Sequence, residues 1–217
     1  FEAYMGIPAG GMVIVPLNTR HALPELLYAL KDSGAKILLT DRSDIGPLQG
    51  SVDLVISLNG QYEEVLANAV QAPLGEDFNE EDLAGLFYTG GTTGASKGVM
   101  LTHRNLIANA FNWLSAVPQS PNDRSLVMAP MFHAAGSNGI LAAIWQGSCQ
   151  VALNTFDPKT VLQLIEKHKI NITLGVPSML AAIAEEQHVN PKDVSSLKIL
   201  AHGGSPIATE VIKRCSQ

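Results

Sequence analysis

A segment rich in glycine and threonine, residues 89–98, carries the residue types best suited to bind an anion. It reads Thr-Gly-Gly-Thr-Thr-Gly-Ala-Ser-Lys-Gly and directly follows an apolar run. Its glycines permit backbone angles that let successive N–H groups converge on a negatively charged group. Threonine hydroxyls and a lysine add donors of the kind that meet phosphate oxygens. The segment therefore predicts a polyphosphate site whose contacts come from Thr89, Gly90, Gly91, Thr92, Thr93, Gly94 and Lys97.

The same residues allow two other interpretations. A glycine-rich loop can simply be a solvated connection, because Gly and Thr are common in loops. Residues 94–98 also match Gly-x-Ser-x-Gly, the nucleophile elbow of α/β hydrolases. The triad would then consist of Ser96, Asp157 and either His168 or His202. An elbow passes from a strand directly into a helix, whereas the apolar run Val-Met-Leu follows here. A Walker A loop is excluded. In that motif Ser or Thr follows the lysine, whereas Gly98 follows Lys97 here.

The composition is that of a folded, acidic protein. Of the 217 residues, 46% are hydrophobic and 16% are charged, which excludes a disordered chain. The net charge of −6 and the lack of Lys and Arg runs argue against a nucleic-acid-binding surface. Two cysteines cannot form a disulfide framework. No apolar run approaches the roughly 20 residues of a membrane helix. We therefore expect a cytoplasmic protein with no transmembrane segment.

Short runs of Val, Ile and Leu alternate with helical patterns along the chain. Continuous apolar runs are typical of buried parallel strands, and intervening helices indicate an α/β fold. Strands are predicted at residues 12–17, 36–40, 53–58, 83–88, 125–128, 147–153, 170–176 and 197–202. Helices are predicted at residues 24–32, 102–113, 157–168 and 177–187, and from 206 onward. The predicted fold is α/β, with largely parallel sheets flanked by helices.

Residues 86–103 closely resemble the AMP-binding signature of the adenylate-forming superfamily. They read Leu-Phe-Tyr-Thr-Gly-Gly-Thr-Thr-Gly-Ala-Ser-Lys-Gly-Val-Met-Leu-Thr-His. The superfamily includes acyl- and aryl-CoA synthetases, luciferases and the adenylation domains of peptide synthetases. Two residues depart from its common pattern, because many members have Pro in place of Ser96 and Ser or Thr in place of Gly90. Further segments resemble landmarks of the family in the same order, namely residues 9–18, 26–41, 130–136, 176–180 and 203–206.

This resemblance implies a partial N-terminal domain of an adenylate-forming enzyme. We expect residues 1–82 to form a first α/β segment and residues 83–217 a second one that carries the phosphate-binding loop. The family's later motifs supply the acid that holds Mg²⁺, the Asp that binds the ribose and a catalytic lysine. They follow the landmark at 203–206 and do not occur here. The resemblance thus implies an internal piece that lacks the C-terminal domain, is inactive alone and self-associates through uncovered apolar surface.

The resemblance also implies a two-step ligase activity. The implied co-substrates are ATP, with Mg²⁺, and CoA, and the implied substrate is a carboxylic acid, for which we expect a fatty acid. An alternative within the superfamily is an adenylation domain of a peptide or polyketide synthetase, in which a carrier protein replaces CoA. No residue of the chain itself is predicted to ligate a metal.

Site residues outside the loop also follow from the resemblance. His133 would be a catalytic residue that lies near the acyl group and the adenylate. Gly203, Gly204 and Ser205 would form a turn beside the adenine and the acyl chain. Without the resemblance, the better interpretation of His133 is a packed core histidine at the end of a strand. The two glycines could likewise simply end a strand.

Overall fold

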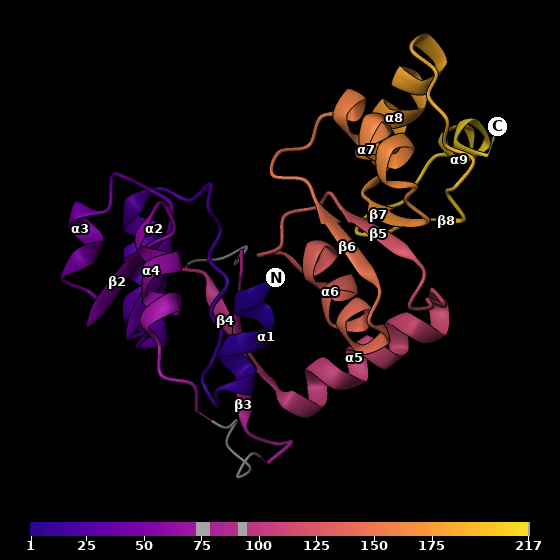
Figure 1. Cartoon of the computed structure of the whole chain (residues 1–217). Helices are drawn as coiled ribbons and strands as arrows, with labels where there is room; N and C mark the ends of the chain where they lie inside the picture. The colour runs from indigo at the N-terminus through magenta and orange to yellow at the C-terminus, as the bar shows by residue number, and fades with distance from the viewer. Residues whose placement is uncertain (73–78, 91–94, 217) are drawn as a thin grey trace. The chain divides into compact units, whose positions relative to one another are not determined.

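The computed structural model describes residues 1–72, 79–90 and 95–216. The chain forms two compact units, Glu2–Arg104 and Asn105–Gln217, and each is described by itself. Figure 1 labels the elements of both. The sequence predicts a different division, into residues 1–82 and 83–217. That division stays a prediction. In the described ranges no helix is long and apolar enough to cross a membrane.

The unit Glu2–Arg104 contains a small parallel β/α layer. Strands β1 (Ile37–Thr40) and β2 (Leu54–Ser57) pair in parallel, and four buried leucines form the core beneath them, namely Leu26, Leu30, Leu38 and Leu48. The covering helix α2 (Leu23–Ser33) ends at Gly34, whose φ of 65° suits glycine. The remaining helices are α1 (Glu2–Ala9), α3 (Gly46–Gln49) and α4 (Gln61–Asn68).

An antiparallel pair completes this unit. Strand β3 (Leu83–Thr89) pairs with β4 (Lys97–Thr102) in a register that places Thr89 opposite Lys97. The predicted strand at residues 12–17 is wrong, because only Ile14 forms a bridge there, with Gly85 of β3. Pro16 has no N–H to continue the ladder. Strand β4 was not predicted by the sequence pattern.

The unit Asn105–Gln217 is built on a four-stranded parallel sheet with strand order β6-β5-β7-β8. The strands are β5 (Arg124–Val127), β6 (Cys149–Ala152), β7 (Ile172–Gly175) and β8 (Ile199–His202). The helices are α5 (His103–Ala116), α6 (Ala134–Gln146), α7 (Pro158–His168), α8 (Pro177–Val189) and α9 (Thr209–Cys215). Helix α5 begins in the preceding unit. The last helix starts three residues later than its predicted start at Pro206.

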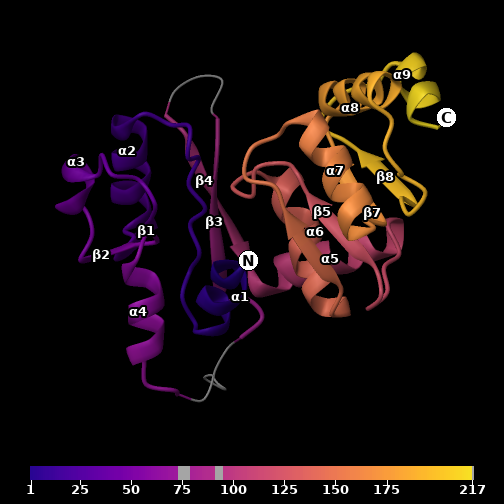
Figure 2. The same cartoon turned by 45° about the horizontal axis from the view of Figure 1, so that its top comes forward.

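Helices cover both faces of this sheet. The connection through α6 runs in the opposite direction along the sheet from those through α7 and α8. Because parallel crossovers are right-handed, α6 lies on one face and α7 with α8 on the other (Figures 1 and 2). The main core lies between the sheet and the α7–α8 layer and includes Leu126, Leu162, Ile165 and Leu180. The predicted class, an α/β fold with largely parallel sheets, is confirmed.

Candidate functional site

The two ends of the glycine-threonine segment lie side by side. Thr89 ends β3 and pairs with Lys97, which begins β4, and both side chains are exposed. The Ser96 hydroxyl donates to the Thr89 carbonyl oxygen at 2.6 Å. A cation and a hydroxyl are therefore held at the same end of one hairpin. Gly90 is described and exposed, whereas the predicted contacts Gly91, Thr92, Thr93 and Gly94 lie outside the described residues.

The backbone after Ser96 differs from that of a hydrolase elbow. The elbow needs a helix directly after the nucleophile, but Lys97–Thr102 forms β4, antiparallel to β3. A strand cannot present the serine on a strand-to-helix turn. The Ser96 hydroxyl closes the base of the segment instead. This geometry argues against the Ser96 nucleophile that the sequence left open.

A second group of predicted residues lies at the carboxyl edge of the parallel sheet. His133 follows β5, and Gly203–Ser205 follow β8. Strands β5, β7 and β8 run parallel, so their carboxyl ends meet at the same edge. After β5 the chain continues to β6, the neighbour of β5 on one side. After β7 it continues to β8, the neighbour of β7 on the opposite side. The edge between β5 and β7 is thus a topological switch point, where ligands of open α/β sheets bind.

His133 is exposed and serves as the N-cap of α6. Its Nδ1 accepts a hydrogen bond from the backbone N–H of Ala135 at 3.1 Å. A neutral imidazole with Nδ1 occupied as acceptor carries its proton on Nε2. Nε2 is then a donor at the helix N-terminus, where negative charge is favoured. The interpretation of His133 as a packed core histidine is wrong, because the side chain is exposed.

The turn after β8 contains two glycines with different constraints. Gly204 has a φ of +84°, a conformation that other residues rarely adopt. Gly203 has no such requirement, and a Cβ added there would meet no atom within 4 Å. The space beside Gly203 is therefore open, while Gly204 is explained by the turn itself. Ser205 is exposed next to them.

A small pocket that is partly open to solvent lies next to this edge, and no sequence pattern predicted it. It has a volume of about 30 Å³, enough for one water molecule. Its lining comes from α5, α6, β5 and β7 and includes Ala129 and Ala135 on the two sides of His133. Two buried lining atoms, Trp113 Nε1 and Ser125 Oγ, have no partner among the described residues. The pocket thus has an indole N–H and a hydroxyl in its lining that could bind a small polar molecule.

Gly136 is a positioning residue that sequence reasoning missed. A Cβ on Gly136 would lie 2.2 Å from the Pro130 carbonyl oxygen. Only glycine lets the first turn of α6 approach the segment after β5 this closely. The sequence did contain a signal for this role. Gly136 lies in the first turn of a helix, where glycine is unfavourable unless close packing requires it.

The predicted site residues thus form two groups, one in each unit. Thr89, Gly90 and Lys97 lie at the end of the β3–β4 hairpin. His133 and residues 203–205 lie at the carboxyl edge of the parallel sheet. Within the described ranges, no group of three or more His, Cys, Asp or Glu side chains is arranged to hold a metal ion.

The whole chain, residues 1–217, matches the sequence family described as AMP-binding enzyme. The chain belongs to this family. A feruloyl-CoA synthase from Amycolatopsis is 35% identical over 216 residues, which are 98% of this chain and 43% of that protein. A long-chain-fatty-acid–CoA ligase from Mycobacterium tuberculosis is 29% identical over 97% of the chain and 43% of its own length. The chain therefore spans less than half the length of these curated relatives.

Solved structures of AMP-binding enzymes share the fold. The inhibitor-bound N-terminal domain of FACL13 from Mycobacterium tuberculosis superposes with a TM-score of 0.87 at 28% identity. That match covers 98% of this chain and 56% of the other. ATP-bound MatB from Rhodopseudomonas palustris gives a TM-score of 0.87 at 25% identity, covering 98% of this chain and 44% of its own. The predicted resemblance to the adenylate-forming superfamily is confirmed.

Proposed function

We propose that this chain is the part of an ATP-dependent carboxylate–CoA ligase that holds the phosphates of ATP and the carboxylic acid. The observation that carries the proposal is the pairing of Thr89 with Lys97 at the end of the β3–β4 hairpin, in a chain that matches the AMP-binding family throughout. A hydroxyl and a cation at one hairpin end suit an anion. The CoA ligases among the curated relatives favour CoA over a carrier protein as the acyl acceptor.

The reaction has two steps. The carboxylate oxygen attacks the α-phosphorus of ATP, the bond to the β-phosphate bridging oxygen breaks, and pyrophosphate leaves. The thiol of CoA then attacks the acyl carbon and loses its proton to solvent, the acyl–oxygen bond breaks, and AMP leaves with the electrons of that bond. In the first step an anion approaches a polyanion, so donors fixed before the reaction lower the barrier. Bound Mg²⁺ would supply further charge neutralisation.

In this proposal the hairpin end holds the β- and γ-phosphates. Thr89, Gly90 and Lys97 supply a hydroxyl, an N–H and a charge, and residues 91–94 complete the set. Lys97 is exposed, so its ammonium group is accessible to a phosphate. A charge-assisted contact of this type contributes about 1.5–3 kcal/mol.

His133 and the turn after β8 orient the acid and the nucleotide. The Nε2–H of His133 is directed by the Ala135 hydrogen bond at the other ring nitrogen, and it donates to the carboxylate of the acid. Gly203 leaves space for a ligand to approach the backbone, and Ser205 adds a hydroxyl. These residues would contact the acyl group and the adenine.

The acid that we propose is a fatty acid, and an aromatic acid is the second candidate. The fatty-acid assignment follows the family resemblance and the long-chain ligase among the relatives. The aromatic candidate is favoured by the 35% identity to a feruloyl-CoA synthase. The two differ in shape and polarity, so a panel of acids separates them.

Two measurements test the proposal. The 217-residue chain should bind MgATP by titration calorimetry. A longer protein that contains this chain and the remaining family segments should exchange labelled pyrophosphate into ATP when given palmitate or ferulate. The better acid in that assay identifies the substrate class. Absence of MgATP binding by the chain would overturn the proposal.

A further inference from the structure

Tyr88, the residue before Thr89, links the β3–β4 hairpin to helix α2. Its phenolic hydroxyl donates to Asp32 Oδ2 at 2.7 Å, across 56 residues of sequence. Asp32 lies in the last turn of α2, which packs on the parallel layer of the same unit. The hydrogen bond therefore ties the end of the hairpin to a separate element with its own core.

The ring of Tyr88 also contacts the opposite strand. Tyr88 is the cross-strand partner of Gly98, and a Cβ added to Gly98 would lie 3.2 Å from Tyr88 Cζ. Glycine at this position leaves room for the ring. Tyr88 is thus itself the neighbour of Thr89 on β3, and its ring packs on Gly98, the neighbour of Lys97 on β4.

The hydroxyl of Tyr88 remains a donor at all physiological pH values. Partial burial and the Asp32 carboxylate raise the pKa of Tyr88 to about 12. The phenol is therefore protonated, and the carboxylate accepts. The hydrogen bond keeps its direction whatever the pH of a binding assay near neutrality.

We propose that Tyr88 and Asp32 are positioning residues that fix Thr89 and Lys97 for the phosphates of the nucleotide. This inference rests on the proposed function. Backbone hydrogen bonds to Ile14 hold β3 at Ala84 and Leu86. Beyond them, the Ser96–Thr89 hydrogen bond closes the hairpin end, and the Tyr88–Asp32 hydrogen bond ties that end to α2. Without that link, the hairpin end pivots as one piece, and Thr89 and Lys97 together spend less time in the orientation that binds a polyphosphate.

Tyr88→Phe isolates the hydroxyl, because the ring still packs on Gly98. We expect the dissociation constants of the chain for MgATP and for magnesium tripolyphosphate to rise about threefold to tenfold, the effect of one hydrogen bond. In ¹H–¹⁵N spectra of the free chain, the amides of Thr89 and Lys97 should shift. A merely structural contact would lower the melting temperature without a change in either dissociation constant.

Tyr62→Phe is the matched control. The Tyr62 hydroxyl donates to Glu2 Oε2 at 2.9 Å in the same unit, so the variant also removes one tyrosine–carboxylate hydrogen bond. We expect it to leave both dissociation constants and the amides of Thr89 and Lys97 unchanged. An equal loss of affinity in both variants would overturn the inference.

A double-mutant cycle completes the test. Asp32→Ala should weaken tripolyphosphate binding as much as Tyr88→Phe, and the double variant should be no worse than either. Asp32→Asn keeps an acceptor and should restore part of the affinity. If the original chain binds MgATP and Tyr88→Phe binds it equally well, the inference alone fails. If the original chain binds no MgATP, the proposed function fails and this role with it.

Discussion

Among single residues, Lys97 offers the sharpest test of phosphate binding. It is exposed at the start of β4, and a solvated lysine contributes little to folding. Lys97→Ala should weaken MgATP binding to the chain roughly tenfold to a hundredfold and leave the ligand-free melting temperature unchanged. Calorimetric titration and thermal melting of the same samples measure both.

Lys36→Ala is the control for Lys97, because it removes the same charge from an exposed lysine of the same unit. We expect normal MgATP affinity in this variant. A large fall in the ligand-free melting temperature of Lys97→Ala, with intact nucleotide binding, would mean that Lys97 is structural and that the phosphate assignment is wrong.

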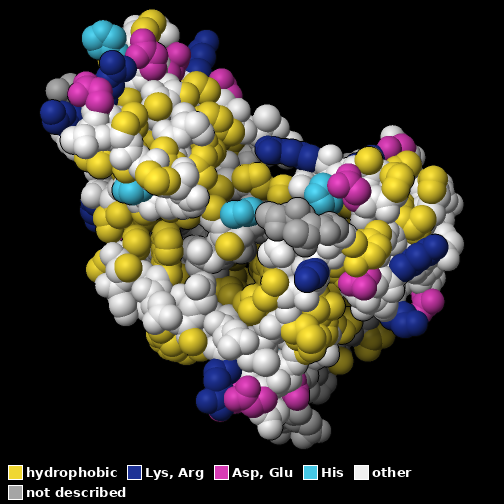
Figure 3. Space-filling model, turned by 180° about the vertical axis from the view of Figure 1, so that it is seen from behind, with side chains coloured by type: hydrophobic (Ala, Val, Ile, Leu, Met, Phe, Trp, Pro, Cys, Tyr) yellow, Lys and Arg dark blue, Asp and Glu magenta, His cyan; other side chains and the backbone are white. Residues whose placement is uncertain are grey.

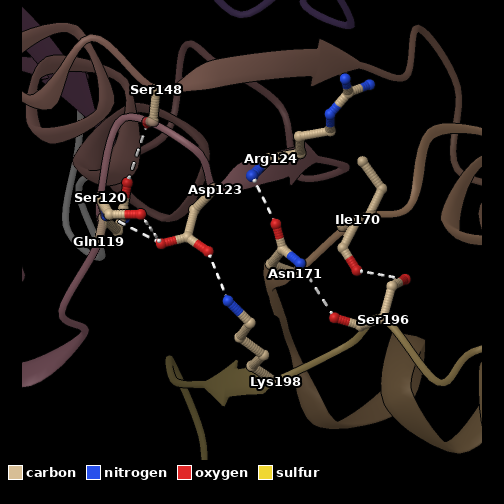
Figure 4. Close-up of polar contacts among 9 residues, drawn as sticks. All are labelled: Gln119, Ser120, Asp123, Arg124, Ser148, Ile170, Asn171, Ser196 and Lys198. Carbon is tan, nitrogen blue, oxygen red and sulfur yellow. Dashed lines mark hydrogen bonds and ion pairs between the residues drawn. The ribbon is translucent and has the colours of Figure 1, made fainter.

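Asp123 is a buried carboxylate that joins two strands at the amino edge of the parallel sheet. It precedes β5 and accepts from Lys198 Nζ at 3.0 Å and from the N–H and hydroxyl of Ser120, each at 2.8 Å. Figure 4 shows the lysine reaching this carboxylate from the start of β8. The Lys198 ammonium and the Ser120 donors lower the pKa of Asp123, although burial opposes them.

This lowered pKa predicts an acid-sensitive contribution to stability. An unfolded Asp has a pKa of about 3.9, so the contribution is fully present above that pH. It is lost as the pH falls through the lower pKa of the folded protein. Asp123→Asn should reduce the free energy of unfolding at pH 7 by about 1–3 kcal/mol. Urea unfolding at decreasing pH should then show that the variant and the original chain differ less and less in free energy of unfolding. A difference that stays constant with pH would contradict the role of the Asp123 carboxylate.

At the scale of elements, the start of helix α6 depends on the close approach at Gly136. A methyl group there would overlap the Pro130 carbonyl, at 2.2 Å, and the Ala129 carbonyl, at 2.6 Å. Backbone atoms cannot move aside as a flexible side chain can. Gly136→Ala should therefore cost about 1–3 kcal/mol of unfolding free energy and displace His133 at the N-cap.

Gly139→Ala is the matched control in the same helix. The nearest atoms to its added Cβ belong to the Trp113 ring at 3.9 Å, an ordinary contact. Alanine is also the better helix former by about 1 kcal/mol. We expect Gly139→Ala to be neutral or slightly stabilising in urea unfolding, and an equal loss in both variants would contradict the role of Gly136.

At the scale of the whole molecule, exposed apolar side chains predict self-association. Phe111 of α5 and Trp145 of α6 make an edge-to-face ring contact at 4.9 Å, yet Trp145 is 60% exposed and Phe111 is 45% exposed. Figure 3 shows further hydrophobic side chains at the surface of the face that it displays. Exposed apolar clusters of this kind commonly mark contact surfaces.

Light scattering after size exclusion tests this expectation. The chain should be partly dimeric or larger at tens of micromolar, and Phe111→Ser with Trp145→Ser should shift it toward the monomer. Val189→Ser is the control, since Val189 is about as exposed as Trp145 but lies at the end of α8. A monodisperse monomer of the original chain would contradict the prediction.

The sequence by itself determined the class of fold and the family. Apolar runs separated by helical patterns were enough to predict the parallel sheets, because strands buried on both faces are continuously apolar. Local chemistry located several helix ends. Asp157 caps α7 through the backbone N–H of Thr160, and Gly34 ends α2. The order of short motifs along the chain identified the superfamily.

The tertiary structure decided which segments become strands and which side chains meet. Strand β4 was missed because its apolar run, Val99 to Leu101, is only three residues long. Pairing with β3 is what makes it a strand. Residues 12–17 looked like a strand but find a partner only at Ile14. The strand order β6-β5-β7-β8 brings His133 and residues 203–205 to one edge. Such pairings join residues far apart in sequence, so they cannot be predicted from the pattern of residues within one segment.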